Sequence, residues 1–229
     1  MVVHLDSGRV AALAALNEPL RRRIYGHVAS QVSAVSRDGT AAALGVARSV
    51  AAFHLDKLAE VGLLEVAYHR PAGRSGPGAG RPAKWYRRAA GEIALSVPER
   101  HYDLAALLLA RAVERVADGS LPVADALGAV AREYGRTIGV RAQRAEECSS
   151  SSIEQVAELL AEQGYEPREE DGTITLANCP FHVLAEEHRD LVCAMNLDLI
   201  RGVVEAAGLP AATARLDPAP GRCCVRLVA

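Results

Sequence analysis

Two helical patterns, a glycine between them and two strand patterns after them occupy residues 37–89, an order that few folds accommodate. Helical spacing predicts a short first helix over Asp38–Leu44, ended by Gly45, and a second helix over Arg48–Glu60. Two helices joined by a glycine-containing turn of roughly three or four residues form a helix-turn-helix. The apolar side of the second helix is expected to comprise Val50, Leu55, Leu58 and Val61.

The residues after these helices predict a β-hairpin with a long basic tip. LLEVAY (63–68) is a plausible strand, RPAGRSGPGAGRPAK (70–84) is a loop rich in glycine, proline and arginine, and WYRRA (85–89) predicts the returning strand. The loop is not a phosphate-binding P-loop, because GAGRPAK lacks the Gly-Lys-Ser/Thr ending and no helix follows it.

Charge divides the 229 residues into a basic and an acidic part. Residues 1–90 hold 13 Lys or Arg and 6 Asp or Glu, a net charge of +7, whereas residues 91–229 hold 13 and 22, a net charge of −9. This asymmetry indicates that the basic part contacts nucleic acid and that the acidic part has a different function. The alternative is two solvated surfaces of opposite sign.

The segment AAALGVARSVAAFHLDKLAEVGLLE (41–65) resembles the winged-helix bacterial repressors of the ArsR/DeoR type. The resemblance lies in Ala42, Leu44-Gly45-Val46, Arg48, Val50, His54-Leu55, Leu58 and Gly62-Leu63. It implies that the basic hairpin is the wing of a DNA-binding domain.

Candidate DNA contacts follow from the chemistry of the two grooves. A helix in the major groove reads base edges, and arginine donates two hydrogen bonds to guanine. The exposed face of the second helix is expected to present Arg48, Ser49, Ala52 and Phe53. Phosphate or groove contacts are expected from Lys57, Arg70, Arg74, Arg81 and Lys84. His54 is interpreted as a structural histidine of the helix packing.

The remaining sequence predicts a helical connector and a second domain. Two amphipathic helices over 103–117 and 122–143 are expected to form a dimer interface or to pack on their own chain. The fold class is therefore α+β. The domains are expected as a winged helix-turn-helix over 1–90, a connector over 91–147 and an α/β sensor domain bearing cysteines over 148–229.

All five cysteines lie in the acidic part, and three separate elements of the last domain each deliver one. Cys179 ends a predicted strand, Cys193 lies in a long helix expected over Ala185–Ala207, and Cys223 or Cys224 lies in a final strand. Thiolates are soft ligands that suit iron–sulfur clusters, zinc or cuprous copper. Cys148 lies in a serine-rich run and is not expected to be a ligand. We found no catalytic constellation and expect no enzyme.

NCPFHVLAEEHRDLVCAMNLDLIRGV (178–203) and the terminal CCVRL resemble the SufR family of iron–sulfur-sensing repressors, as does the wing segment GRSGPGAGRPAKWY. The resemblance implies a homodimer that binds operator DNA when each subunit holds a cluster, usually four-iron four-sulfur (4Fe-4S), and that controls cluster-assembly genes. It implies Cys179, Cys193 and Cys223 as the ligands.

The fourth ligand stays open. His182, three residues after Cys179, is preferred, then an exchangeable small ligand, then Cys224. Cys224 comes last because successive side chains of a strand point to opposite faces.

Two other functions remain open. One is a winged-helix repressor that senses zinc or a small organic ligand, and the other is a thiol- or cluster-dependent reductase. No apolar run approaches the roughly 18 residues of a membrane span, and acidic and basic residues interrupt the start of the chain. A cytoplasmic protein is therefore expected.

Overall fold

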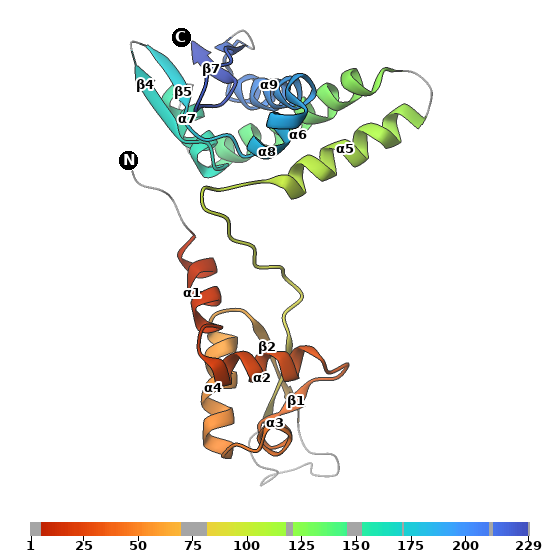
Figure 1. The fold of residues 1–229 in the computed structure, drawn as a ribbon, viewed down its shortest axis with the longest axis vertical. Helices are drawn as coiled ribbons and strands as arrows, with labels where there is room; N and C mark the ends of the chain where they lie inside the picture. Colours follow the sequence, from red (N-terminus) through yellow and green to blue (C-terminus); the bar gives the residue numbers. More distant parts are fainter. Residues whose placement is uncertain are drawn as a thin grey trace. The chain divides into compact units, whose positions relative to one another are not determined.

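The computed structural model describes residues 6–69, 82–117, 121–145, 153–170, 172–210 and 213–228. The protein is a mixed α+β structure of two compact units, which we call the N-terminal unit (Leu5–Leu95) and the C-terminal unit (Ser96–Ala229) (Figure 1). None of the helices in the described residues combines the length and apolar character needed to cross a bilayer.

The N-terminal unit combines helices with one small antiparallel sheet. The elements are α1 (Ser7–Ala15), α2 (Pro19–Ala29), β1 (Val35–Ser36), α3 (Arg37–Leu44), α4 (Arg48–Glu60), β2 (Leu64–His69) and β3 (Ala83–Arg88). The strands lie in the order β1-β3-β2, and β2 pairs with β3 from Leu64 opposite Arg88 to His69 opposite Ala83.

Local signals explain the ends of α3 and α4. The Ser36 hydroxyl accepts a hydrogen bond of 3.0 Å from the Gly39 amide, which caps the start of α3. Gly45 ends α3 at φ +66°, a left-handed conformation that glycine adopts without strain. The prediction of a helix over Arg48–Glu60 is confirmed.

The core of this unit lies between α1, α2, α4 and the sheet. Leu55 and Leu58 of α4 are fully buried with Ile24 and Tyr86. The placement of Val50 on the apolar side was wrong: its exposed fraction is 37%, because Ala51, which is fully buried, and not Val50 faces inward in the first turn of α4.

The C-terminal unit packs helices on a four-stranded antiparallel sheet of order β4-β5-β7-β6. Its elements are α5 (Tyr102–Ala117), α6 (Val123–Ala145), α7 (Ile153–Glu162), β4 (Pro167–Glu170), β5 (Thr173–Leu176), α8 (His182–Glu187), α9 (Arg189–Ala206), β6 (Ala214–Leu216) and β7 (Val225–Val228). The two helices expected in the connector, α5 and α6, belong to this unit.

Glycines bring α6 and α9 into close contact, the most extensive packing between two elements of this unit. A Cβ atom on Gly135 would lie 2.0 Å from the carbonyl oxygen of Leu199, and one on Gly202 would lie 2.1 Å from that of Arg132. These approaches leave room for hydrogen only, so α9 is held tightly against α6.

Two predicted elements differ from those observed. The long helix expected over Ala185–Ala207 is two helices, because the chain leaves helical geometry at His188 (φ −127°, ψ 50°) between α8 and α9. The final strand begins only at Val225, so Cys223 and Cys224 precede it.

Candidate metal centre and nucleic-acid surface

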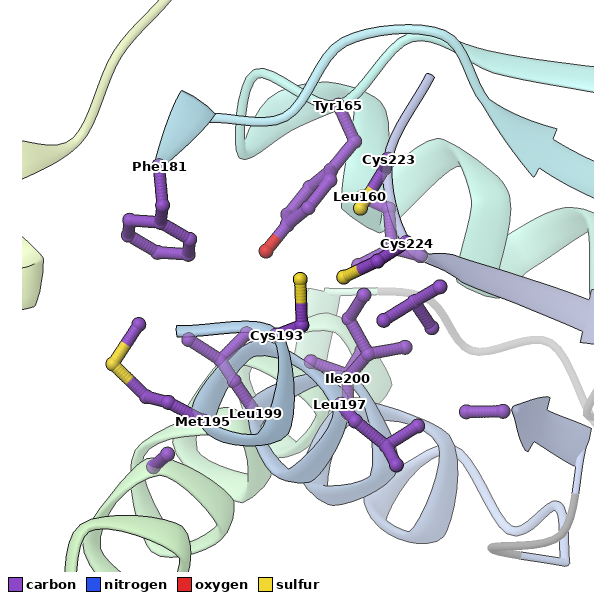
Figure 2. Close-up of a cluster of buried hydrophobic side chains, with 14 of the residues drawn as sticks. Leu160, Tyr165, Phe181, Cys193, Met195, Leu197, Leu199, Ile200, Cys223 and Cys224 are labelled. Carbon is purple, nitrogen blue, oxygen red and sulfur yellow. The ribbon is translucent and has the colours of Figure 1, made fainter. Parts of the chain in front are cut away.

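Three segments of the C-terminal unit deliver four buried thiols to one place. Cys179 lies in the turn between β5 and α8, Cys193 lies in the second turn of α9, and Cys223 and Cys224 directly precede β7. The Cys223 amide donates 2.8 Å to the Leu176 carbonyl oxygen, which fixes the last segment beside β5. Figure 2 shows the sulfur atoms of Cys193, Cys223 and Cys224 turned towards one another.

The four thiols lie next to one another and line one cavity, and we call them the thiol row. Cys179 contacts Cys223, Cys223 contacts Cys224, and Cys224 contacts Cys193. Their exposed fractions are between 1% and 8%. The row therefore joins all three segments through sulfur alone.

Burial and mutual contact favour the neutral thiols. The contact with Cys223, followed by burial, raises the pKa of Cys179. At Cys223 the hydrogen bond from Cys179 lowers the pKa, but the contact with Cys224 and burial outweigh it and raise the value to about 12. Burial raises the pKa of Cys193. A ligand that needs thiolates must therefore compensate the cost of deprotonation.

Beside the thiol row lies a cavity of about 640 Å³ with several cations in its wall. Arg100, Arg189 and Arg222 line it, against the carboxylates of Glu166 and Glu186. Arg100 donates 3.0 Å to the Cys179 carbonyl oxygen and contacts Asn178. Positive charge at this position favours thiolates and anionic groups bound to them.

Sequence reasoning missed two residues that support the site. Asn196 of α9 is fully buried, and its amide nitrogen donates 3.2 Å to the sulfur of Cys223. Its amide oxygen accepts 2.5 Å from the hydroxyl of Tyr165, which is also buried. The available signal was spacing, because Asn196 follows Cys193 by three residues and so shares its helix face.

The sequence analysis preferred His182 to Cys224 as the fourth ligand. The two side chains lie in different surroundings. The His182 side chain is 54% exposed and pairs with Glu186 at 3.2 Å, although it does line the cavity. Cys224 belongs to the thiol row. The premise that Cys223 and Cys224 alternate along a strand was wrong, because both precede β7, where strand geometry does not apply.

The four thiols are soft donors that line one cavity. In the residues that the structure describes, no three His, Cys, Asp or Glu side chains surround one point as a mononuclear site requires. The thiols lie in a row along a cavity instead, and thiolates are the ligands of iron–sulfur clusters. Cys148 lies outside the described residues.

The expected reading face of α4 is open in the N-terminal unit. Arg48, Ser49 and Phe53 are exposed, with Phe53 at 62%, and Ala52 is half-buried. Arg48 pairs with Asp38 at 2.5 Å in an exposed ion pair that costs little to break. His54 is buried and its Nδ1 atom accepts 3.4 Å from the Arg21 Nε atom, which fits its structural interpretation.

Several expected phosphate contacts already have acidic partners. Lys57 pairs with Glu60 at 2.9 Å, and Lys84 pairs with Asp56 at 2.8 Å. Asp56 also accepts 2.7 Å from the Tyr86 hydroxyl and 2.6 Å from Arg37, so Lys84 is part of a network that joins the sheet to α3 and α4. Burial and Asp56 raise the pKa of Tyr86 to about 12.

Three of the arginines expected to contact DNA lie between β2 and β3 in the sequence. Arg70, Arg74 and Arg81 lie outside the described residues.

Comparison of the chain with protein-family models, with curated proteins and with solved structures gave no match.

Proposed function

We propose that this protein is a transcriptional repressor that senses an iron–sulfur cluster, most simply 4Fe-4S, and controls cluster-assembly genes. It binds operator DNA as a homodimer when the cluster is present and releases it when the cluster is lost. The observation that carries the proposal is the convergence of four buried thiols from three segments on one cavity.

Cys179, Cys193 and Cys223 would hold the cluster, and the contacts of Cys224 make it the leading candidate for the fourth position. His182 and an exchangeable ligand remain alternatives. The arginines of the cavity wall would offset the negative charge of the thiolates. When bound, the cluster supplies a link between α9 and the two cysteine-bearing loops that oxidation can break.

For the N-terminal unit we propose a winged helix-turn-helix. Supporting it are two helices joined by a turn at Gly45, a hairpin of β2 and β3 after them that pairs with β1, and the open face of α4. The net charge of +7 over residues 1–90 favours a polyanion. Arg48 would read guanine, and the exposed ring of Phe53 would contact thymine methyl groups.

An apolar stripe on α5 supports the dimer. Residues spaced by three or four positions along this helix share an exposed face: Ala106, Leu107, Ala110, Val113 and Ala117. Leu107 is 43% exposed and Val113 is 61% exposed. Pairing of α5 with its copy would cover this face and join two N-terminal units in one dimer, as an operator of two half-sites requires.

The packing of α9 offers a route from thiols to dimer. Cys193 lies on α9, which is held against α6 through glycines, and α6 in turn packs on α5. A shift of α9 on loss of its sulfur links would therefore reach the proposed dimer face. Coupling requires only that the two states differ in DNA affinity, and a few kcal/mol suffice.

The first test is the absorption spectrum of protein purified without oxygen, with iron, sulfide and zinc assayed on the same sample. We expect a brown protein with about four irons and four sulfides per chain. A colourless protein with one zinc would mean that the proposed repressor senses zinc and not an iron–sulfur cluster. A colourless protein without metal after reconstitution would overturn the cluster proposal.

The second test measures operator binding. DNA selected from random duplexes with the holo protein is titrated by fluorescence anisotropy against holo and metal-free protein. Cys179→Ser, Cys193→Ser and Cys223→Ser are expected to bind as the metal-free protein does, whereas Cys148→Ser, the control, binds as wild type. If all three variants bind like the holo wild type, the cluster does not control DNA affinity.

A further inference from the structure

The thiol row has a property that cluster binding does not require. Within it, Cys179 contacts Cys223 and Cys193 contacts Cys224, each across two different segments of the fold, and all four side chains line one cavity. The Cys223 amide also donates to the carbonyl oxygen of Leu176, three residues before Cys179. The sulfur atoms of Cys193, Cys223 and Cys224 face one another in Figure 2. Thiols already in contact need little backbone movement to become a disulfide.

Covalent geometry decides which contacts can become bonds. Consecutive Cα atoms across a trans peptide are about 3.8 Å apart. Unstrained disulfides span Cα separations of roughly 4.4–6.8 Å. A bond between the neighbours Cys223 and Cys224 is therefore strained, and each of them has one other thiol within contact: Cys179 for the first and Cys193 for the second.

We propose that peroxides oxidise the metal-free protein to a form with two specific disulfides, Cys179–Cys223 and Cys193–Cys224. The proposal concerns the protein without metal, so it stands whether or not the cluster proposal holds.

The cavity gives a small oxidant access to the pairs. Cys179, Cys193 and Cys224 are 7–8% exposed and line the cavity, whereas Cys223 is 1% exposed. Attack by a cavity-lining thiolate on the peroxide breaks its O–O bond, leaving a sulfenic acid and one water. The partner sulfur then attacks that sulfur, the S–S bond forms and a second water leaves. Each pair consumes one peroxide and loses two hydrogen atoms.

Arg100 and Arg189 lie in the wall of the cavity beside these thiols. The two bonds would join the same segments that the thiol row joins. They would also use up all four sulfur ligands, so the oxidised protein would take up no metal until a dithiol reduced it.

The test uses the full-length chain carrying Cys148→Ser, stripped of metal with a chelator and treated with hydrogen peroxide. After acid quenching and alkylation, the intact mass is expected to show the loss of four hydrogen atoms and no alkylated cysteine. Trypsin cuts after Arg189 and Arg222, which places Cys179, Cys193 and the adjacent pair on three different peptides.

Single variants separate the two adjacent cysteines, which no protease can divide. In Cys224→Ser we expect a crosslink from Cys223 to the Cys179 peptide, with Cys193 alkylated. In Cys223→Ser we expect a crosslink from Cys224 to the Cys193 peptide, with Cys179 alkylated. The same chains oxidised in denaturant are the control and should give mixed pairings.

Three oxidation products would overturn the proposal. They are a Cys179–Cys193 crosslink as the main product, crosslinks exchanged between the two variants, and irreversible oxidation of the cysteines without crosslinks. A folded protein that peroxide leaves fully reduced would also contradict it. Circular dichroism of each variant before oxidation shows that the chain tested is folded.

Discussion

Asn196 is a polar residue in the most buried part of a helix whose other buried residues are apolar or cysteine. Its amide oxygen accepts a hydrogen bond from the Tyr165 hydroxyl, and its amide nitrogen donates one to the Cys223 sulfur. A buried amide that lost these partners would cost about 1–3 kcal/mol. The residue therefore fixes the position of the Cys223 sulfur relative to α9, which carries Cys193.

Replacing Asn196 tests this role. Asn196→Leu keeps a side chain of similar size but leaves the Tyr165 hydroxyl unpaired, so the free energy of unfolding should fall by about 1–3 kcal/mol in denaturant titrations. The Cys223 thiol should alkylate faster in metal-free protein, measured by mass spectrometry. In a cluster-bearing protein the reduction potential should become more negative, because a hydrogen bond to sulfur is lost.

Tyr165→Phe is the matched control. It removes the hydroxyl but leaves the Asn196 amide bonded to Cys223, so the alkylation rate and the potential should change less than in Asn196→Leu. Equal changes in both variants would mean that the amide acts only through packing.

At the scale of elements, the contact of α6 with α9 is the main joint of the C-terminal unit. Gly135 and Gly202 allow backbone to approach backbone, and Glu205 of α9 accepts hydrogen bonds from Arg132 and Arg136 of α6. These bonds, that from Arg132 first, lower the pKa of Glu205. Close backbone packing at the glycines therefore holds the two helices together, and the arginine–Glu205 ion pairs add to this contact.

Gly135→Ala should open this joint. The added Cβ atom has no room beside the Leu199 carbonyl, so the helices must separate, and we expect a loss of about 3 kcal/mol or more in unfolding free energy. Gly26→Ala in α2 is the control, because a Cβ atom there meets nothing within 4 Å. It should leave stability unchanged or raise it by up to about 1 kcal/mol. A stable Gly135→Ala protein would contradict the packing described.

Glu205 should make the joint sensitive to acid. Because its pKa is lower in the folded protein, its stabilising contribution is fully present above its ordinary pKa of 4.5 and is lost as the pH falls through the folded value. Its side chain is 25% exposed, so we expect only about 1 kcal/mol. Glu205→Gln should unfold more easily at neutral pH, and its difference from wild type should vanish in strong acid.

At the scale of the whole molecule, the proposed dimer rests on the exposed apolar residues of α5. Leu107 and Val113 lie on the outer face of α5, while the opposite face buries Ala105, Leu108 and Ala112 in the core. Large exposed apolar groups arranged on one helix face are typical of an interface. A proposed repressor of an inverted repeat needs such an interface to join its two reading helices.

Charges on this stripe should produce monomers. Leu107→Glu with Val113→Glu is expected to halve the mass measured by light scattering, because pairing would bury two like charges on each helix. DNA affinity should fall with it. Val32→Glu, at an exposed loop position of the N-terminal unit, is the control and should leave the mass unchanged. A double variant that keeps the wild-type mass would place the interface elsewhere.

The sequence alone determined the elements whose ends are set locally. Gly45 ends α3 where the sequence predicted, and the limits predicted for α4 match those observed. Three cysteines on three predicted elements already suggested a soft-metal site. These predictions needed only neighbours along the chain, because caps, turns and periods act within a few residues.

Only the tertiary structure decided which side chains meet. The place of Cys224 in the thiol row, the support from Asn196 and the close approach at Gly135 all depend on contacts between residues far apart in sequence. The exposure of Val50 was of the same kind, because the fold turns Ala51 and not Val50 inward in the first turn of α4. Side chains are buried or paired by whatever the fold brings against them, and local pattern does not specify that partner.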